Sequence, residues 1–308
     1  MEFKGNPECN YSMDSNTGPS MGSKGNDEFP LPVIVCIAKL EQNYIEEFVQ
    51  YHLALGFTRI YLFDNEDVPT YAELLKSYVE SGHLYVTHLP RNDHCVLNDL
   101  GQYLYIPVQY LALHIFTERI MSDPQITHVA HIDIDEFIVL KKHENISEFI
   151  KEYIKDDCAG IGMNWRIFGS SFNTEPIDKP VTMRFTMCEE KGHQCIKTIF
   201  KKEEFVKFDT CHAIVTKTGK IKSTNGSLPE GPFNYNVDYS VIQLNHYKCK
   251  TLPEFRYIRT RQRADAVGET NEDVDANFKQ YDINEIEELT ARNKYMSIKG
   301  TKGTCRSL

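Results

Sequence analysis

The N-terminal part of the chain alternates between short apolar runs and segments with apolar residues at helical spacing. Val33–Ala38 is a continuous apolar run of the kind that forms a strand buried on both faces. Between residues 43 and 55 the apolar side chains recur at helical spacing, and a glycine follows as a stop signal. The runs 58–63 and 84–89 predict two more strands, with a helix over 70–80 between them. This β-α-β-α-β order predicts a parallel sheet with right-handed crossovers.

The pattern changes character further along the chain. A long helix is predicted over 100–121, with Pro107 interrupting it, and a fourth strand over 126–132. After a helix over 147–155, short apolar segments separated by Gly, Pro and Asn indicate mixed β structure. Its strands are predicted over 160–165, 181–187, 195–200, 213–216 and 241–244, and two helices are predicted over 252–264 and 283–294.

The amino-acid composition indicates how the chain is divided into domains and tails. With 308 residues, 41% hydrophobic and 25% charged, the chain can bury the core of one large domain. Residues 1–29 are rich in Gly, Ser and Asn and predict a disordered tail. We expect one domain over 30–295, with a nucleotide-binding half to residue 140 and a mixed β half after it, and a flexible tail over 296–308.

Charge and cysteine content narrow the classes of function and the compartment. The formal net charge of -10 argues against nucleic-acid binding, because phosphate neutralisation needs a surplus of Lys and Arg. No run approaches the roughly 20 apolar residues of a membrane span, and the first residues do not read as a signal peptide. Nine cysteines without any CxxC pair suit reduced thiols. The chain as given therefore predicts a soluble, cytoplasmic protein.

Two carboxylates stand one residue apart at the end of the predicted fourth strand. On an extended backbone, Asp133 and Asp135 would point to the same side, because the period of a strand is two. Two acids so close repel each other unless a cation accompanies them, and Mg²⁺ or Mn²⁺ fits oxygen ligands that also bridge to substrate phosphates. The alternative is a solvated acidic turn, and Glu136 is expected to be an exposed acid. No GxGxxG or P-loop motif is present.

Polar residues after the other predicted strands are candidates for nucleotide binding, because ligands bind at the carboxyl ends of strands in such sheets. The candidates are Ala38, Lys39 and Glu41 after the first strand, Asp64 and Asn65 after the second, Arg91 after the third, and Gln109 on the long helix. Asp and Asn also favour turns and helix caps, which is the alternative for Asp64 and Asn65. In the basic run 248–263, Lys250 is the candidate for a diphosphate contact, and a solvated helix face is the alternative.

A set of motifs follows one another along the chain: 36–41, 44–48, 51–52, Ile60-Tyr61-Leu62-Phe63-Asp64-Asn65, Asp133-Ile134-Asp135-Glu136-Phe137, Trp165-Arg166-Ile167-Phe168-Gly169-Ser170, 196–199 with His212, Asn245-His246-Tyr247, 254–255 and 281–285. In this order they resemble the glycosyltransferases of family 92 and the related family-2-like transferases. The resemblance implies a GT-A fold of the α/β class, in which a mostly parallel nucleotide-sugar sheet flanked by helices joins a mixed β acceptor half. The chain departs from the family at Leu40, where an asparagine is usual.

The resemblance also implies roles for individual residues. Asp135 would be a direct metal ligand, with Asp133 reaching the metal through water or binding the ribose, and His246 would be a further ligand, since mixed O/N coordination suits Mn²⁺. Aromatic faces pack on sugar rings, so Trp165, with Phe168 and Gly169 in the same motif, is predicted to bind the acceptor. Core packing is the alternative for the tryptophan, and a satisfied structural histidine is the alternative for His246.

The predicted function is a metal-dependent, inverting glycosyltransferase that uses a UDP- or GDP-linked sugar and a glycan or glycoprotein acceptor. Inversion requires a group that takes the acceptor proton, and Asp209, Glu189 and Asp238 are acids of the acceptor half that spacing does not separate. One alternative is an inactive nucleotide-sugar or carbohydrate-binding module, and another is a two-metal phosphatase or nuclease. Because many relatives are Golgi enzymes, a soluble form of a Golgi or virus-encoded enzyme is the alternative to a cytoplasmic protein.

Overall fold

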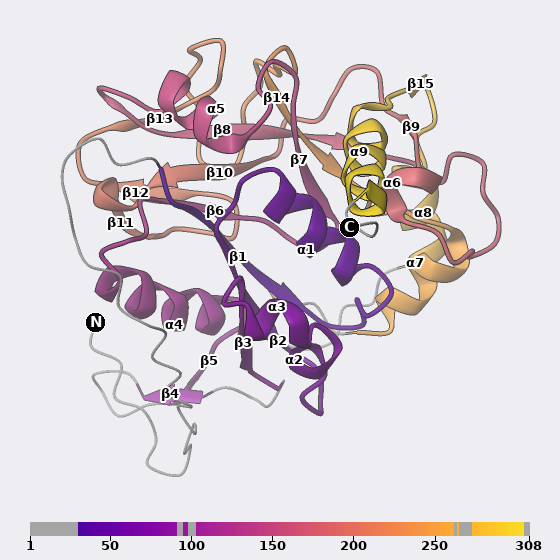
Figure 1. Ribbon diagram of the computed structural model, residues 1–308, viewed down its shortest axis with the longest axis horizontal. Helices are drawn as coiled ribbons and strands as arrows, with labels where there is room; N and C mark the ends of the chain where they lie inside the picture. Colours follow the sequence, from indigo (N-terminus) through magenta and orange to yellow (C-terminus); the bar gives the residue numbers. More distant parts are fainter. Residues whose placement is uncertain (1–29, 91–94, 98–102, 262–263, 265–272, 305–308) are drawn as a thin grey trace.

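A nine-stranded sheet forms the centre of the computed structural model, which describes residues 30–90, 95–97, 103–261, 264 and 273–304. The main strand order is β3-β2-β1-β6-β10-β8-β14-β7, and β13 pairs with β8 off this path (Figure 1). The predicted tail over 1–29 lies outside the described residues. The α/β class predicted from the sequence is confirmed, with helices on both sides of the sheet.

The first half of the sheet has the predicted parallel arrangement. Its strands are β1 (Pro32–Ala38), β2 (Arg59–Asp64), β3 (Leu84–His88) and β6 (His128–His131), and the pairs β3/β2, β2/β1 and β1/β6 are all parallel. Helix α1 (Ile45–Ala54) follows β1 as expected. The carboxyl ends of β1 and β6 therefore meet at one edge of the sheet.

Two helices of this half differ from the prediction. The helix predicted over 70–80 is divided into α2 (Tyr71–Leu74) and α3 (Lys76–Glu80). The long helix predicted over 100–121 begins only at Val108, as α4 (Val108–Ser122), because Pro107 is its N-cap residue and a proline in a helix interior removes a hydrogen bond. Before it, β4 (Cys95–Leu97) and β5 (Tyr103–Tyr105) form an antiparallel pair.

The second half of the sheet mixes parallel and antiparallel neighbours, as predicted. Strand β10 is antiparallel to β6 and β8, β14 is antiparallel to β7, and both β13 and β14 are parallel to β8. The bounds in this half are β7 (Glu136–Leu140), α5 (Ile146–Tyr153), β8 (Cys158–Ile167), α6 (Val181–Arg184), β9 (Met187–Cys188), β10 (Ile196–Lys201), η1 (Lys202–Glu204), β11 (Phe205–Phe208), β12 (Ile214–Thr216), β13 (Lys220–Lys222), β14 (Ile242–His246), α7 (Leu252–Arg259), α8 (Val274–Tyr281), β15 (Ile286–Glu287) and α9 (Thr290–Thr304).

Two predictions for this half were wrong. The strand expected over 181–187 is the short helix α6, whose first N–H groups, at Val181 and Thr182, donate to the Glu47 carboxylate at 2.5 and 3.0 Å. A carboxylate at a helix N-terminus stabilises the helix, and sequence periodicity does not reveal a partner that lies 134 residues away. The helix expected over 283–294 starts at Thr290, after β15, and it continues to Thr304.

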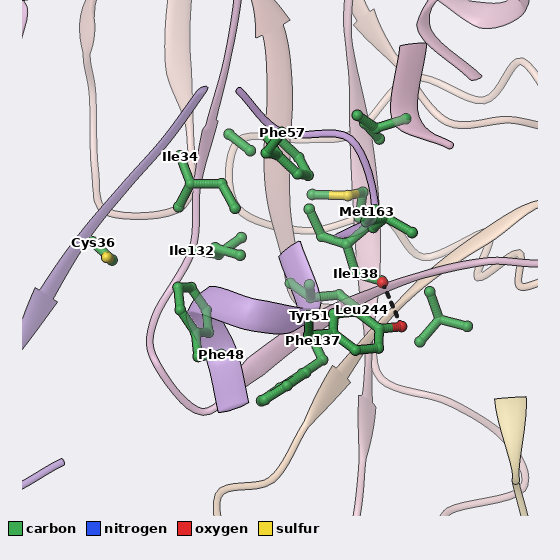
Figure 2. Packing of buried hydrophobic residues seen from close by; sticks show 14 of the residues in the cluster. Ile34, Cys36, Phe48, Tyr51, Phe57, Ile132, Phe137, Ile138, Met163 and Leu244 are labelled. Atoms are coloured by element: carbon green, nitrogen blue, oxygen red, sulfur yellow. Dashed lines mark hydrogen bonds between the residues drawn. The ribbon is translucent and has the colours of Figure 1, made fainter. Parts of the chain in front are cut away.

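Alternating side chains of β1 enter two separate hydrophobic clusters, one on each face of the sheet. Ile34 and Cys36 pack with Phe48 of α1, whereas Val33 and Val35 belong to the cluster under α4. Figure 2 shows the α1 side, where the Tyr51 hydroxyl also donates to the Ile138 carbonyl at 3.1 Å. Burial on both faces explains why β1 reads as an unbroken apolar run.

None of the helices in the described part of the chain is long and apolar enough to cross a membrane. The six cysteines whose side chains the structure describes are free thiols.

Candidate functional site

The acidic pair lies on a tight turn between β6 and β7 and not on an extended strand. The Glu136 N–H donates to the Asp133 carbonyl at 3.0 Å, and the Asp133 N–H donates to Glu136 Oε2 at 2.8 Å. These reciprocal bonds close the turn, so the same-side arrangement expected for an extended backbone does not apply. Asp133 and Asp135 instead face different partners, and their side chains are 35% and 15% exposed.

His246 reaches this turn through strand pairing. It is the last residue of β14 and stands opposite Glu136, the first residue of β7. The Tyr247 N–H donates to the Asp135 carbonyl at 2.8 Å, which ties the two segments together, and His246 Nε2 lies 3.6 Å from Asp135 Oδ2. The predicted proximity of Asp135 and His246 is therefore present, although 111 positions separate them in the chain.

Lys197 of β10 lies on the other side of the turn. Its Nζ is 3.0 Å from Asp133 Oδ2 and 3.9 Å from Glu136 Oε2, and its side chain is 1% exposed. Glu136, expected to be an exposed acid, is fully buried. Burial raises the pKa of Glu136 well above its ordinary value, although Lys197 opposes this effect.

A second group of charges approaches Asp135 from the loop after β1 and from the segment after β14. Arg261 Nη1 donates to Glu41 Oε1 at 2.8 Å and to the Lys39 carbonyl. Burial alone would raise the pKa of Asp135, but His246, Lys250 and Arg261 outweigh burial, and this pKa lies below its ordinary value. Asp135 is therefore an anion, and the positive charges of Lys250 and Arg261 favour this state.

Of these two cations, Lys250 was predicted from the sequence and Arg261 was not. Lys250, chosen from the basic run, is 3% exposed, and its Nζ lies 4.6 Å from the centre of the Tyr44 ring. Its backbone φ of 54° is uncommon for a residue with a side chain and points to a position that the surrounding structure imposes. Arg261 was not singled out by the sequence, because a charge run does not show which of its members folds back onto the first strand.

Trp165 stands among three histidine rings beside the acidic turn. Its ring centroid lies 4.3 Å from that of His246, 5.1 Å from that of His212 and 5.5 Å from that of His193. His212 Nδ1 donates to the Ile196 carbonyl at 3.0 Å, which leaves its Nε2 with a lone pair. Burial, followed by Lys197, lowers the pKa of His212 to about 4, so the ring is neutral at pH 7.

Residues 31–293 match the sequence pattern of glycosyltransferase family 92. The chain belongs to glycosyltransferase family 92. No curated protein matches the sequence.

Among solved structures, the family 92 chain is similar to S. aureus TarS crystallised with UDP and with UDP-GlcNAc. The identities are 13% and 15% and the TM-scores 0.33 and 0.32, over 56% of this chain and 46% and 45% of the TarS chains. The chain thus spans less than half of the length of these two structures. A putative glucose-1-phosphate thymidylyltransferase from Bacillus anthracis matches at 8% identity and a TM-score of 0.32, over 56% of this chain and 71% of that one. The assignment of the chain as a glycosyltransferase rests on the family match.

The predicted donor residues of this family 92 chain are distributed unevenly around the site. Glu41 is 2% exposed and contacts Arg261, while the exposed Asp67 forms an ion pair with Lys39 at 2.7 Å. Burial raises the pKa of Glu41, against the effects of Arg261 and Lys250. The two predicted residues Lys39 and Glu41 therefore lie on the edge of the sheet that carries the acidic turn.

The residues after the second strand have structural partners instead. The Asp64 carboxylate accepts the N–H groups of Glu66, Thr70 and Tyr71 at 3.0, 2.7 and 3.0 Å, so it holds the loop before α2 in the way expected of a cap. The Asn65 amide donates to the Leu89 carbonyl at 2.8 Å.

Two of the remaining donor candidates, Ala38 and Gln109, belong to the part of the chain that the structure describes. Ala38 is fully buried at the end of β1, Gln109 is 6% exposed near the start of α4, and Arg91 lies outside the described residues.

The motif around Trp165 is only partly available to an acceptor. Phe168 is fully buried and packs against Tyr247 with ring centroids 4.7 Å apart, so it presents no surface to a sugar, contrary to the prediction. A Cβ on Gly169 would lie 2.5 Å from the Ile283 carbonyl oxygen, which shows that this glycine is needed for close backbone packing. Trp165 remains the acceptor candidate of this motif.

A divalent cation can bind near the acidic turn only if suitable donor atoms lie close to one another. Among the residues that the structure describes, no group of three or more His, Cys, Asp and Glu side chains is arranged to hold a metal ion. Asp135 Oδ2 and His246 Nε2, 3.6 Å apart, can both reach one ion at the usual distance of about 2.1 Å. An ion at this position would have two protein donors and would need further oxygen ligands, which suits Mg²⁺ and Mn²⁺.

Proposed function

We propose that this family 92 glycosyltransferase moves a sugar from a UDP- or GDP-linked donor to a hydroxyl group of a glycan or glycoprotein, with Mn²⁺ or Mg²⁺ as its cofactor. The observation that supports this proposal is the charge arrangement at the carboxyl ends of β1 and β6. Arg261 contacts Glu41 of the loop after β1, Lys250 lies just after β14, and both lower the pKa of Asp135, which is 3.6 Å from His246. Ligands of α/β sheets bind at this edge, and a nucleoside diphosphate carries the charge that such cations bind.

The chemistry requires stabilisation of the diphosphate as the bond to the sugar breaks. The guanidinium of Arg261 and the ammonium of Lys250 would bind the negative charge that develops on the leaving group, and both are already held in place by neighbouring groups. The divalent ion, held by Asp135 and His246, would supply Lewis acidity. Trp165 would offer its half-buried face to the acceptor sugar.

The proposed inversion needs a group that takes the acceptor proton. Two of the acids considered from the sequence have structural partners: Glu189 accepts the Ile167 N–H at 2.8 Å, and Asp238 accepts the Thr224 hydroxyl at 2.7 Å. Asp209 is an exposed residue after β11. His212 Nε2, with its lone pair beside Trp165, is a further acceptor of protons on this face.

The test is a transfer assay with a panel of UDP- and GDP-sugars and Mn²⁺, which measures free nucleoside diphosphate and glycosylated product. We expect turnover with one donor, and a loss of at least 100-fold in the Asp135→Asn variant. Asp178→Asn, at an exposed position, is the matched control and should keep full activity. Donor binding without product in every combination would favour the binding-module hypothesis, and full activity in Asp135→Asn would refute the site.

A further inference from the structure

Lys197 is a buried cation built into the acidic turn. It lies on β10, which runs antiparallel to β6 with Ile199 opposite Ala130, and this pairing brings position 197 beside the end of β6. Burial disfavours the charge of a lysine, but Asp133 and Glu136 outweigh burial and raise the pKa of Lys197. The side chain is therefore an ammonium ion at neutral pH although it is 1% exposed.

The turn concentrates acid in a short stretch of chain. Asp133, Asp135 and Glu136 lie within four positions, and Glu136 is fully buried. Carboxylates so close together repel one another unless a positive charge accompanies them. Lys197 contacts two of these acids and leaves the third, Asp135, to face His246. The fold thus divides the acidic turn into a part that the protein neutralises and a part that faces the ligand side.

We propose that Lys197 is a positioning residue, a permanent cation that holds Asp133 within the protein and takes the place of a second divalent ion, so that the turn binds one ion and not two. The proposal rests on the proposed function, because it assumes that Asp135 and His246 hold a cation. It separates this site from two-metal sites, in which carboxylates bridge a pair of ions about 4 Å apart. It also assigns Asp133 an electrostatic partner that the acidic motif alone does not reveal.

The sign of the effect follows from Coulomb's law. A positive charge within the turn repels an arriving divalent cation, and Asp133 cannot approach that cation freely while it is bonded to Lys197. Removal of the lysine charge should therefore strengthen metal binding by about tenfold or create a second binding equivalent. A residue that only packs the core would weaken metal binding when it is replaced, or would leave it unchanged.

The experiment measures Mn²⁺ stoichiometry and affinity by electron paramagnetic resonance, and the melting temperature with and without Mn²⁺, in the whole chain. The variants are Lys197→Met, Lys197→Arg and the double variant Lys197→Met with Asp133→Asn. Lys222→Met is the matched control, because Lys222 forms an ion pair with Asp157 at 2.7 Å elsewhere on the sheet.

We expect one Mn²⁺ in the unmodified protein, tighter or additional binding in Lys197→Met, and a larger rise of its melting temperature on addition of Mn²⁺. Lys197→Arg and Lys222→Met should bind Mn²⁺ as the unmodified protein does. Should Lys197→Met not fold, the double variant decides, because it removes both charges of the pair and should bind one Mn²⁺ with unchanged affinity.

Two results would overturn the proposal and can be told apart. A Lys197→Met protein with unchanged Mn²⁺ affinity and stoichiometry, or a double variant that loses Mn²⁺ as Asp135→Asn does, contradicts the role of Lys197 and leaves the proposed transfer reaction intact. An unmodified protein that binds no Mn²⁺ contradicts the metal part of the proposed function together with this inference.

Discussion

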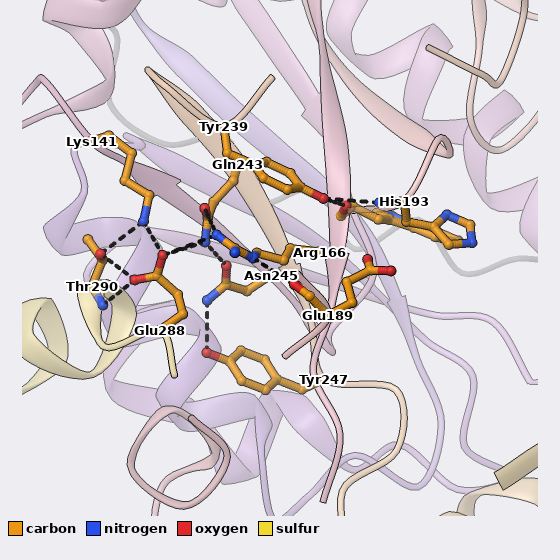
Figure 3. A network of polar contacts seen from close by, with 11 residues as sticks. Lys141, Arg166, Glu189, His193, Tyr239, Gln243, Asn245, Tyr247, Glu288 and Thr290 are labelled. Carbon is orange, nitrogen blue, oxygen red and sulfur yellow. Dashed lines mark hydrogen bonds and ion pairs between the residues drawn. The ribbon is translucent and has the colours of Figure 1, made fainter. Parts of the chain in front are cut away.

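Replacement of Glu288 by glutamine should destabilise the whole second half of the sheet. Figure 3 shows its carboxylate between strands and helix, where Oε1 accepts the Thr290 N–H at 2.8 Å at the start of α9. Its Oε2 accepts from Lys141, the residue directly after β7, and from Arg166 of β8 and Gln243 of β14 at 3.4 Å each. One carboxylate thus joins three adjacent strands to the C-terminal helix.

The magnitude follows from the pKa of this group. Burial alone would raise the pKa of Glu288, but the hydrogen bonds from Lys141 and Thr290 lower it to about 2. Relative to an ordinary glutamate near 4.3, this shift corresponds to roughly 3 kcal/mol of stability at pH 7. Because the folded pKa is depressed, the contribution is present in full above about pH 4.3 and is lost as the pH falls towards 2. The side chain is 11% exposed, so solvent screening is small.

The assay is urea unfolding followed by circular dichroism at pH 7 and pH 3.5. We expect Glu288→Gln to reduce the free energy of unfolding by about 3 kcal/mol at pH 7 and by less at pH 3.5. The exposed neighbour supplies the matched control, Glu287→Gln, which should change it by no more than about 0.5 kcal/mol. A loss in Glu288→Gln no larger than in this control, or a loss that grows as the pH falls, would refute the electrostatic reasoning.

Three further predictions concern backbone strain, the diphosphate site and acid stability. Leu40 has a φ of 59°, a backbone conformation that asparagine adopts more easily than leucine. Leu40→Asn should therefore raise the free energy of unfolding, measured by urea titration, by roughly 1 kcal/mol. A decrease would show that the backbone at Leu40 is not strained. Arg261→Met should weaken the binding of a UDP- or GDP-sugar about tenfold, as measured by calorimetry. Arg256→Met, which removes an exposed ion pair, should leave this affinity unchanged. Equal effects of the two substitutions would argue against a diphosphate contact of Arg261. Burial lowers the pKa of both His128 and His212 to about 4, so their contribution to stability is full above about pH 6.5 and is lost as the pH falls towards 4. A His128→Gln variant should therefore show a flatter pH dependence of the urea unfolding midpoint. An unchanged slope would contradict this account.

Local pattern was sufficient for the frame of the fold and for one part of the site. The strands β1 and β2 are buried on both faces, and such strands leave an unbroken apolar run that can be read without a structure. Asp133 and Asp135 were found for a similar reason, because two acids directly after a buried strand are a short-range signal. The stop imposed by Pro107 was also visible, although the prediction started the helix too early.

The partners of these acids were decided by tertiary structure. Lys197 lies 64 positions from Asp133, and Arg261 lies 220 positions from Glu41, and strand pairing or a returning loop brings each pair together. The same holds for the burial of Glu136 and Phe168, since an isolated acid or ring in a sequence carries no record of what covers it. The chain by itself therefore determined where the strands lie and where acid follows them. The pairing of distant strands decided which charges meet there, because electrostatic interactions depend on distance in space and not on separation along the chain.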